Sequence, residues 1–136
     1  TDGSMTPMDV NMSWILANDK PFSYIGRRSF TIEALAKDDR FQLVGLLTKD
    51  ASFVMPEGAH IVDDNRSSIG YVTSSYFSPV LGRSIALAQL QNGLNKLGDT
   101  VVVKIVQKRQ GLKEIPCEVS SSVFYDPNGE RVDGNE

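Results

Sequence analysis

The chain has 136 residues, of which 40% are hydrophobic and 23% are charged, and its formal net charge is −3. This length predicts a single domain, or a single domain with an attached remnant, whose core needs neither a disulfide nor a metal. The acidic balance argues against nucleic acid or an anionic membrane as the main partner, because both attract basic surfaces.

Two short helices are predicted before Arg40. Thr6 and Pro7 fit the N-cap and the first position of a helix, and Met8 and Trp14 would lie along one side of it. A second helix is predicted over residues 28–37, where the apolar residues give a mixed apolar face. The chain therefore begins with a short α-helical segment.

From Arg40 onward apolar and polar residues alternate, which is the period of a half-buried strand. Pro79 ends the strand before it because proline offers no N–H to a ladder, and Gly82 makes a corner before the next strand. The fold class is therefore mainly β, a barrel or sandwich of short strands. Six strands are predicted, over residues 41–48, 59–63, 69–77, 85–90, 100–107 and 112–123. A tail over residues 129–136 is expected to fray.

No signal peptide is expected at the start of the chain. Thr1 to Ser4 contain no initiator methionine and no charged segment followed by an apolar one, so we expect an excised piece of a longer, cytoplasmic polypeptide. The apolar stretches are far shorter than the roughly 20 residues that span a bilayer. The lone cysteine, Cys117, is expected to be a small strand residue in a reducing compartment.

Motifs for a self-contained active site are absent from the sequence, which has no HExxH, CxxC, GxSxG or glycine-rich phosphate loop. The serines at 74–75 and 120–122 have no plausible base nearby, and we interpret their hydroxyls as partners of backbone groups. His60 is expected to be an exposed or half-buried strand residue. A lone histidine near two aspartates is a poor metal site, so no metal is expected.

Three passages carry a resemblance to a known family. They are GYVTSSYFSPVLGRSIALA at 70–88, VFYDP at 123–127 with Gly129-Glu-Arg131 after it, and an N-terminal set at Thr6-Pro7, Ser13-Trp14 and 22–28. Together they resemble the C-terminal domain of the folate-dependent aminomethyltransferases, the T protein family of the glycine cleavage system. Within that family the chain is similar to the C-terminal end of the α subunit of heterotetrameric sarcosine oxidase.

The resemblance implies a six-stranded Greek-key barrel over residues 40–128, with residues 1–39 as a remnant of the preceding folate-binding domain. It implies a parent protein that uses tetrahydrofolate, with FAD or FMN and NAD bound elsewhere in the assembly. The partners it implies are the preceding domains of the same polypeptide and other sarcosine oxidase subunits. This piece would close one side of the folate cavity, carry no redox centre and be inactive alone.

Four residues are candidates for that role. Arg131 would bind a carboxylate of the pteroylglutamate, or else is a solvated arginine of the tail, and Tyr125 would supply an aromatic wall. Trp14 belongs either to the core of the N-terminal segment or to the wall of the ligand cavity. Arg83 either pairs with a carboxylate across the barrel or faces another domain.

A rival interpretation belongs to a different class of protein. The chain would then be a free-standing barrel that binds a partner and has no part in catalysis, as similar barrels do in translation factors. The length of the reading frame upstream of Thr1 separates the two.

Overall fold

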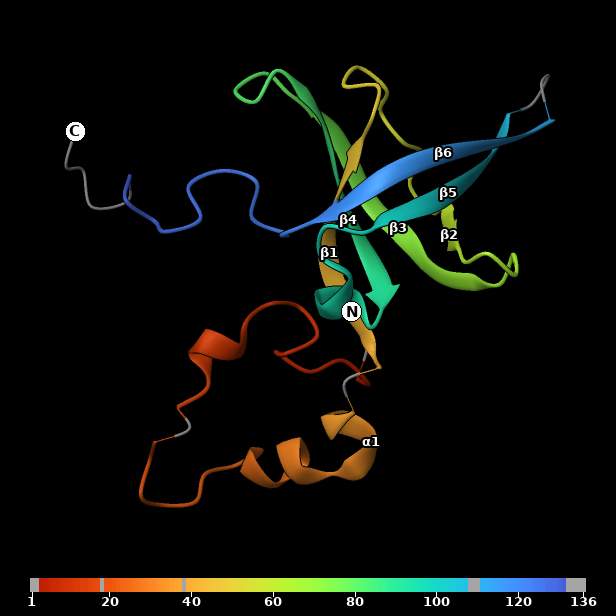
Figure 1. Ribbon diagram of the computed structural model, residues 1–136. Helices are drawn as coiled ribbons and strands as arrows, with labels where there is room; N and C mark the ends of the chain where they lie inside the picture. The colour runs from red at the N-terminus through yellow and green to blue at the C-terminus, as the bar shows by residue number, and fades with distance from the viewer. Residues whose placement is uncertain (1–2, 18, 38, 108–110, 132–136) are drawn as a thin grey trace.

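The computed structural model describes residues 3–17, 19–37, 39–107 and 111–131 (Figure 1). Its body is a closed antiparallel barrel in the order β1-β4-β3-β2-β5-β6, which confirms the mainly β fold class and the six strands. Strands β2, β3 and β4 follow one another, and β1 lies beside β4, which is a Greek-key arrangement. The strands are β1 (Phe41–Thr48), β2 (His60–Val62), β3 (Ser68–Ser78), β4 (Arg83–Gln91), β5 (Thr100–Gln107) and β6 (Gly111–Ser120).

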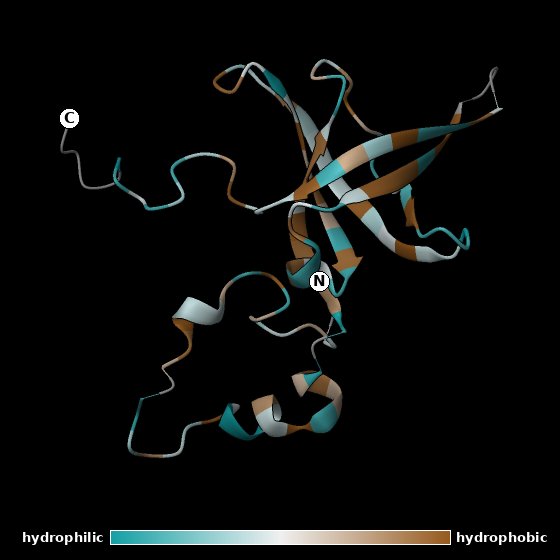
Figure 2. Cartoon of the chain, viewed as in Figure 1, coloured by the Kyte–Doolittle hydropathy of each residue, from teal (hydrophilic) through white to brown (hydrophobic). Residues whose placement is uncertain are grey.

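The alternation of apolar residues along the strands produces the core. Val44 and Leu46 of β1, Ala88 and Leu90 of β4 and Val103 of β5 point inward and are fully buried. Figure 2 shows the matching bands of apolar and polar colour along the barrel strands. Pairing of β1 with β6 closes the wall and leaves no unpaired edge.

The long connection between β1 and β2 closes one end of the barrel. It inserts Met55, whose backbone N–H donates to Ser75 Oγ at 3.1 Å and whose Sδ lies 3.5 Å from Cys117 Sγ. All three residues are buried, and burial raises the pKa of the Cys117 thiol to about 11. Cys117 is thus the small strand residue that was predicted.

Strand β6 ends at Ser120, whereas the alternation predicts a strand to residue 123. Its last pairing joins Ser120 to Gly45, after which the chain crosses over β1. The predicted turn-rich connection after β4 contains a 3₁₀ turn, η3 (Gly93–Lys96). The predicted tight loop before β6 ends in Gly111 with φ +77°, as expected for glycine, and residues 108–110 lie outside the described residues.

The predicted helix over 28–37 is wrong as a single element. The structure has a 3₁₀ helix, η2 (Arg27–Thr31), and one α-helical turn, α1 (Glu33–Ala36), separated by Ile32 in an extended conformation. Thr31 Oγ1 donates to the Arg28 carbonyl at 2.9 Å. Neither piece buries a residue, so packing does not offset the cost of a longer helix.

The helix predicted from Thr6 is also wrong and is replaced by a short turn. The Met12 N–H donates to the Pro7 carbonyl at 2.8 Å, and Asn11 ends the turn with φ +58°. A 3₁₀ turn, η1 (Ser13–Ile15), follows. Within the described residues, no helix is long and apolar enough to cross a membrane.

Candidate functional site

The C-terminal segment, residues 121–131, lies against the outside of the barrel wall at Gly45. A Cβ at this glycine would overlap the Ser121 carbonyl oxygen and lie 2.7 Å from Phe124 Cε1. Glycine is therefore required at this position of β1 because it lets the segment approach the backbone. Phe124 is held over the wall as a result.

Tyr125 and Arg131 are brought together by a turn that Asp126 organises. Asp126 has φ +50°, and its carboxylate accepts the N–H groups of Glu130 at 2.9 Å and of Arg131 at 3.1 Å. The Arg131 guanidinium carbon then lies 5.2 Å from the centre of the Tyr125 ring, within the range of a cation–π contact. Both side chains are exposed, so the pair faces outward from the barrel.

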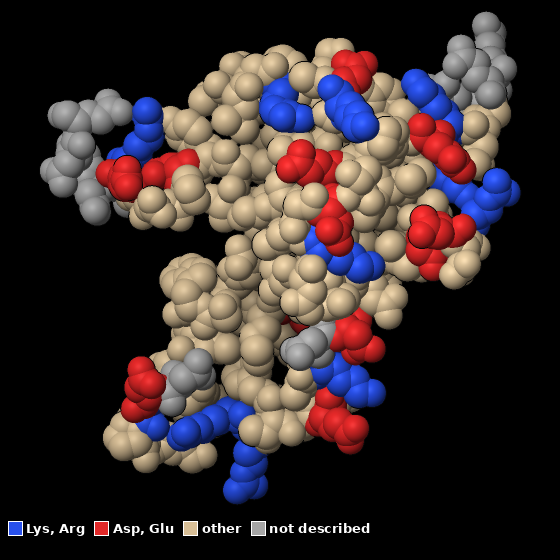
Figure 3. Space-filling view, in the orientation of Figure 1, with Lys and Arg blue, Asp and Glu red and all other residues tan. Residues whose placement is uncertain are grey.

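Trp14 lies on a separate segment and is not a core residue, since 80% of its surface is exposed. That finding overturns the interpretation of Trp14 as part of the N-terminal core. Asn11 Nδ2 donates to Ser122 Oγ at 3.1 Å and so links the N-terminal and C-terminal segments. Figure 3 shows the molecule hollowed between these two segments. The ring contact of Arg131 is with Tyr125, whereas Trp14 lies on the N-terminal segment in the 3₁₀ turn η1.

Arg83 binds a backbone group rather than a carboxylate. Its Nη2 donates to the Thr48 carbonyl at 2.8 Å, which ties the start of β4 to the end of β1. Neither the Arg40–Asp9 nor the Lys104–Glu114 ion pair of the described residues involves Arg83, so the predicted pairing of Arg83 with a carboxylate across the barrel is wrong. The antiparallel pairing of β1 with β4 brings the Thr48 carbonyl at the end of β1 beside Arg83 at the start of β4.

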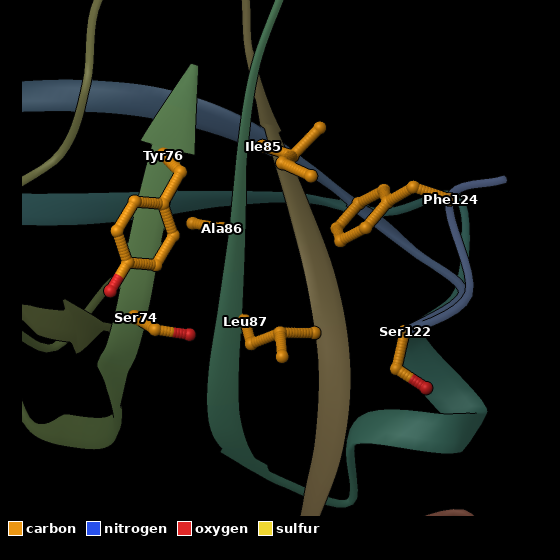
Figure 4. Close-up of a pocket in the computed structure, with 7 residues that line it drawn as sticks. All are labelled: Ser74, Tyr76, Ile85, Ala86, Leu87, Ser122 and Phe124. Atoms are coloured by element: carbon orange, nitrogen blue, oxygen red, sulfur yellow. The ribbon is translucent and has the colours of Figure 1, made fainter. Parts of the chain in front are cut away.

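An apolar hollow of about 210 Å³ lies on the outer wall beneath the C-terminal segment (Figure 4). The rings of Tyr76 and Phe124 stand on either side of Ile85 and Leu87, and the Ser74 hydroxyl points toward Leu87. The lining residues are Ser74, Tyr76, Ile85, Ala86, Leu87, Ser122 and Phe124. Sequence reasoning missed this hollow, although large apolar residues at the outward positions 85 and 87 were a signal for it.

His60 and Ser75, two other chemically active side chains, lie beside neighbouring polar groups. His60 Nδ1 lies 2.9 Å from Ser68 Oγ, and the described residues include no group of three His, Cys, Asp or Glu that could hold a metal. Ser75 Oγ binds backbone groups of Met55 and Ile85, as predicted for the strand hydroxyls. The site offers apolar contact, an aromatic ring and a cation, which are means of binding.

The fold is a closed six-stranded antiparallel barrel of Greek-key arrangement, with a C-terminal segment folded against its wall. The family model of the glycine cleavage T-protein C-terminal barrel domain matches residues 42–126, and the chain belongs to this family.

Curated relatives agree with that assignment. The chain is 36% identical over 141 aligned residues to the sarcosine oxidase subunit alpha of Corynebacterium sp. (strain U-96), with 98% of the chain and 14% of that protein covered. It is 32% identical to the aminomethyltransferase of Synechococcus sp. (strain CC9311), with 91% of the chain and 31% of that protein covered. The chain thus spans about a seventh of the first relative and a third of the second.

A solved structure has the same fold. The glycine cleavage system aminomethyltransferase T from Bartonella henselae superposes with a TM-score of 0.69 at 24% identity, with 86% of the chain and 31% of that protein covered.

Proposed function

We propose that this chain is the C-terminal barrel of a larger enzyme, either sarcosine oxidase α-like or a folate-dependent aminomethyltransferase, and that it closes one side of a tetrahydrofolate cavity. The observation that carries the proposal is the pairing of Arg131 with Tyr125 on an outward-facing turn. A planar cation over an aromatic ring suits a ligand that has both a carboxylate and a ring system, because the guanidinium can bind the carboxylate in a bidentate manner.

The proposal divides the chain into residues 1–39 from a preceding folate-binding domain, a barrel over 40–128 and a tail from 129. The family match over residues 42–126 supports the bounds proposed for the barrel. Exposed apolar side chains support the assignment of residues 1–39 to a preceding domain. They include Trp14, Phe22 and Ile25, which a neighbouring domain would cover. In this proposal FAD or FMN and NAD bind elsewhere in a cytoplasmic assembly, and Trp14 faces the folate cavity.

The test is Arg131→Ala in the complete parent enzyme. Loss of a charge-assisted hydrogen bond costs about 1.5–3 kcal/mol, which is roughly a ten- to hundredfold weakening of tetrahydrofolate binding. Amine oxidation at the flavin should be unchanged, because the flavin is bound elsewhere. Lys49→Ala is the matched control, since Lys49 is an exposed cation in the loop after β1.

Titration of tetrahydrofolate while both activities are followed separates the outcomes. Unchanged folate affinity in Arg131→Ala would show that Arg131 does not bind the folate and is a solvated arginine of the tail. Loss of both activities together would show that the C-terminal segment maintains the fold instead. A reading frame that starts near Thr1 would favour the rival, a free-standing barrel that binds a partner.

A further inference from the structure

The residues that line the apolar hollow are all uncharged. No Asp, Glu, Lys or Arg occurs from Ser67 to Gly82, from Ser84 to Asn95 or from Val119 to Tyr125, although 23% of the chain is charged. These three stretches include most outer positions of β3 and β4, with Arg83 at the start of β4 as the charged exception, and the part of the C-terminal segment that covers them. Depletion of charge together with enrichment of aromatic residues is the compositional signal of a protein interface.

The hollow has the size of a socket for a side chain. Its volume of about 210 Å³ is below the roughly 300–1,000 Å³ of small-molecule sites. Tyr76 at its rim is 66% exposed, so a partner could cover much of this residue. Ile85 and Leu87 form its floor (Figure 4). An apolar side chain inserted between the Tyr76 and Phe124 rings would cover surface that is now hydrated.

We infer that the socket face, defined as the seven residues lining this hollow, docks another domain of the same polypeptide through one inserted apolar side chain. The inference rests on the proposed function, which makes this chain one module of a larger enzyme. Its support is that the chain matches 14% of one relative and 31% of another, so that in both relatives the barrel is accompanied by much additional polypeptide.

The uncharged surface also disfavours other occupants. A nucleic acid or a charged peptide needs charges that the socket face lacks. A second copy of the chain would have to insert a protruding apolar side chain into the hollow in a two-fold arrangement. Dimerisation of the chain in solution would therefore overturn the inference.

The experiment compares hydroxyl-radical labelling of two tyrosines in the complete parent polypeptide and in the 136-residue chain. Tyr76 lies on the socket face, whereas Tyr71 is on the same strand, is 44% exposed and lies opposite His60. In the parent, labelling of Tyr76 should fall by about fivefold or more, because docking removes the ring from water. Labelling of Tyr71 should change little.

A charge placed in the hollow provides the second arm. Leu87→Asp in the parent should restore labelling of Tyr76 because an unpaired carboxylate opposes docking, whereas Tyr71→Asp should leave Tyr76 protected. Equal labelling of Tyr76 in the parent and in the chain would overturn the inference and leave the folate proposal standing. Equal protection of both tyrosines would also overturn it, because docking would then not select this face. A reading frame confined to this chain would overturn both proposals.

Discussion

Arg40 binds Asp9 through two nitrogens, with Nη2 2.7 Å from Oδ2 and Nε 3.0 Å from Oδ1. The Asp9 carboxylate also accepts the Thr6 N–H at 2.8 Å, and Arg40 reaches the carbonyl groups of Ser4 and Ala34. The Leu43 N–H donates to the Asp9 carbonyl at 2.6 Å. This ion pair therefore fastens the N-terminal segment to the start of the barrel.

Removal of the cation should loosen that attachment. Arg40→Met leaves Asp9, which is 3% exposed, as a buried and unpaired carboxylate, and should lower the free energy of unfolding by about 3 kcal/mol. Arg28→Met is the matched control and should have little effect, because Arg28 is exposed. Urea unfolding followed by circular dichroism measures the difference, and an equal loss in both variants would contradict this role of Arg40.

Acid should weaken the same attachment. Burial alone would raise the pKa of Asp9, but hydrogen bonds from Arg40 and Thr6 outweigh it and hold the pKa below the ordinary 3.8. A lowered pKa in the folded state adds stability above the unfolded pKa, and this stability is lost as the pH falls below about 4. The stability gap between wild type and Asp9→Asn should therefore narrow as the pH is lowered from 6 toward 3. A difference in the free energy of unfolding between these two proteins that does not change with pH would contradict this role of the Asp9 carboxylate.

Gly45→Ala should detach the C-terminal segment, because no space exists for a Cβ against Ser121 and Phe124. We expect a loss of about 1–3 kcal/mol, typical of overpacking, and faster chymotrypsin cleavage after Phe124 or Tyr125. Gly3→Ala is the control, since a Cβ there meets nothing within 4 Å. Unchanged cleavage in Gly45→Ala would mean that the barrel wall can shift to admit a methyl group.

Met55→Ala should leave a cavity at the closed end of the barrel. The side chain is buried and packs beside Cys117, so its truncation should cost about 2–5 kcal/mol in the free energy of unfolding. Val54→Ala, at an exposed neighbouring position, should cost much less. Cys117 should then react faster with thiol reagents in Met55→Ala than in wild type, and a protected thiol would argue that the loop does not close the barrel.

The barrel could be predicted from the sequence because short strands with a period-two pattern, and a compact apolar run over residues 85–90, are separated by turn residues. Residues 41–48 and 100–107 have the predicted bounds, since their alternating side chains face a core on one side only. The split of the predicted helix at Ile32 could not be predicted, because the absence of packing against it is not visible in a local pattern.

The candidate site shows the same division. Tyr125 and Arg131 could be proposed from the resemblance, but their contact depends on the carboxylate of Asp126. The carbonyl partner of Arg83 and the hollow beside Phe124 arise from residues far apart in the chain. Such contacts appear only once the strands are in register.

The pairing of Gly45 with Ser120 places the first and last strands side by side. Phe41, where β1 begins, is therefore only about 13 Å along the strand from the point where β6 ends, at about 3.3 Å per residue. A module whose two ends emerge together can be inserted into a longer chain, or joined to a new one, without forcing the flanking parts apart. That geometry is compatible with the same barrel occurring in polypeptides of very different lengths. It would allow gene fusion to join the barrel to other domains without changing its fold.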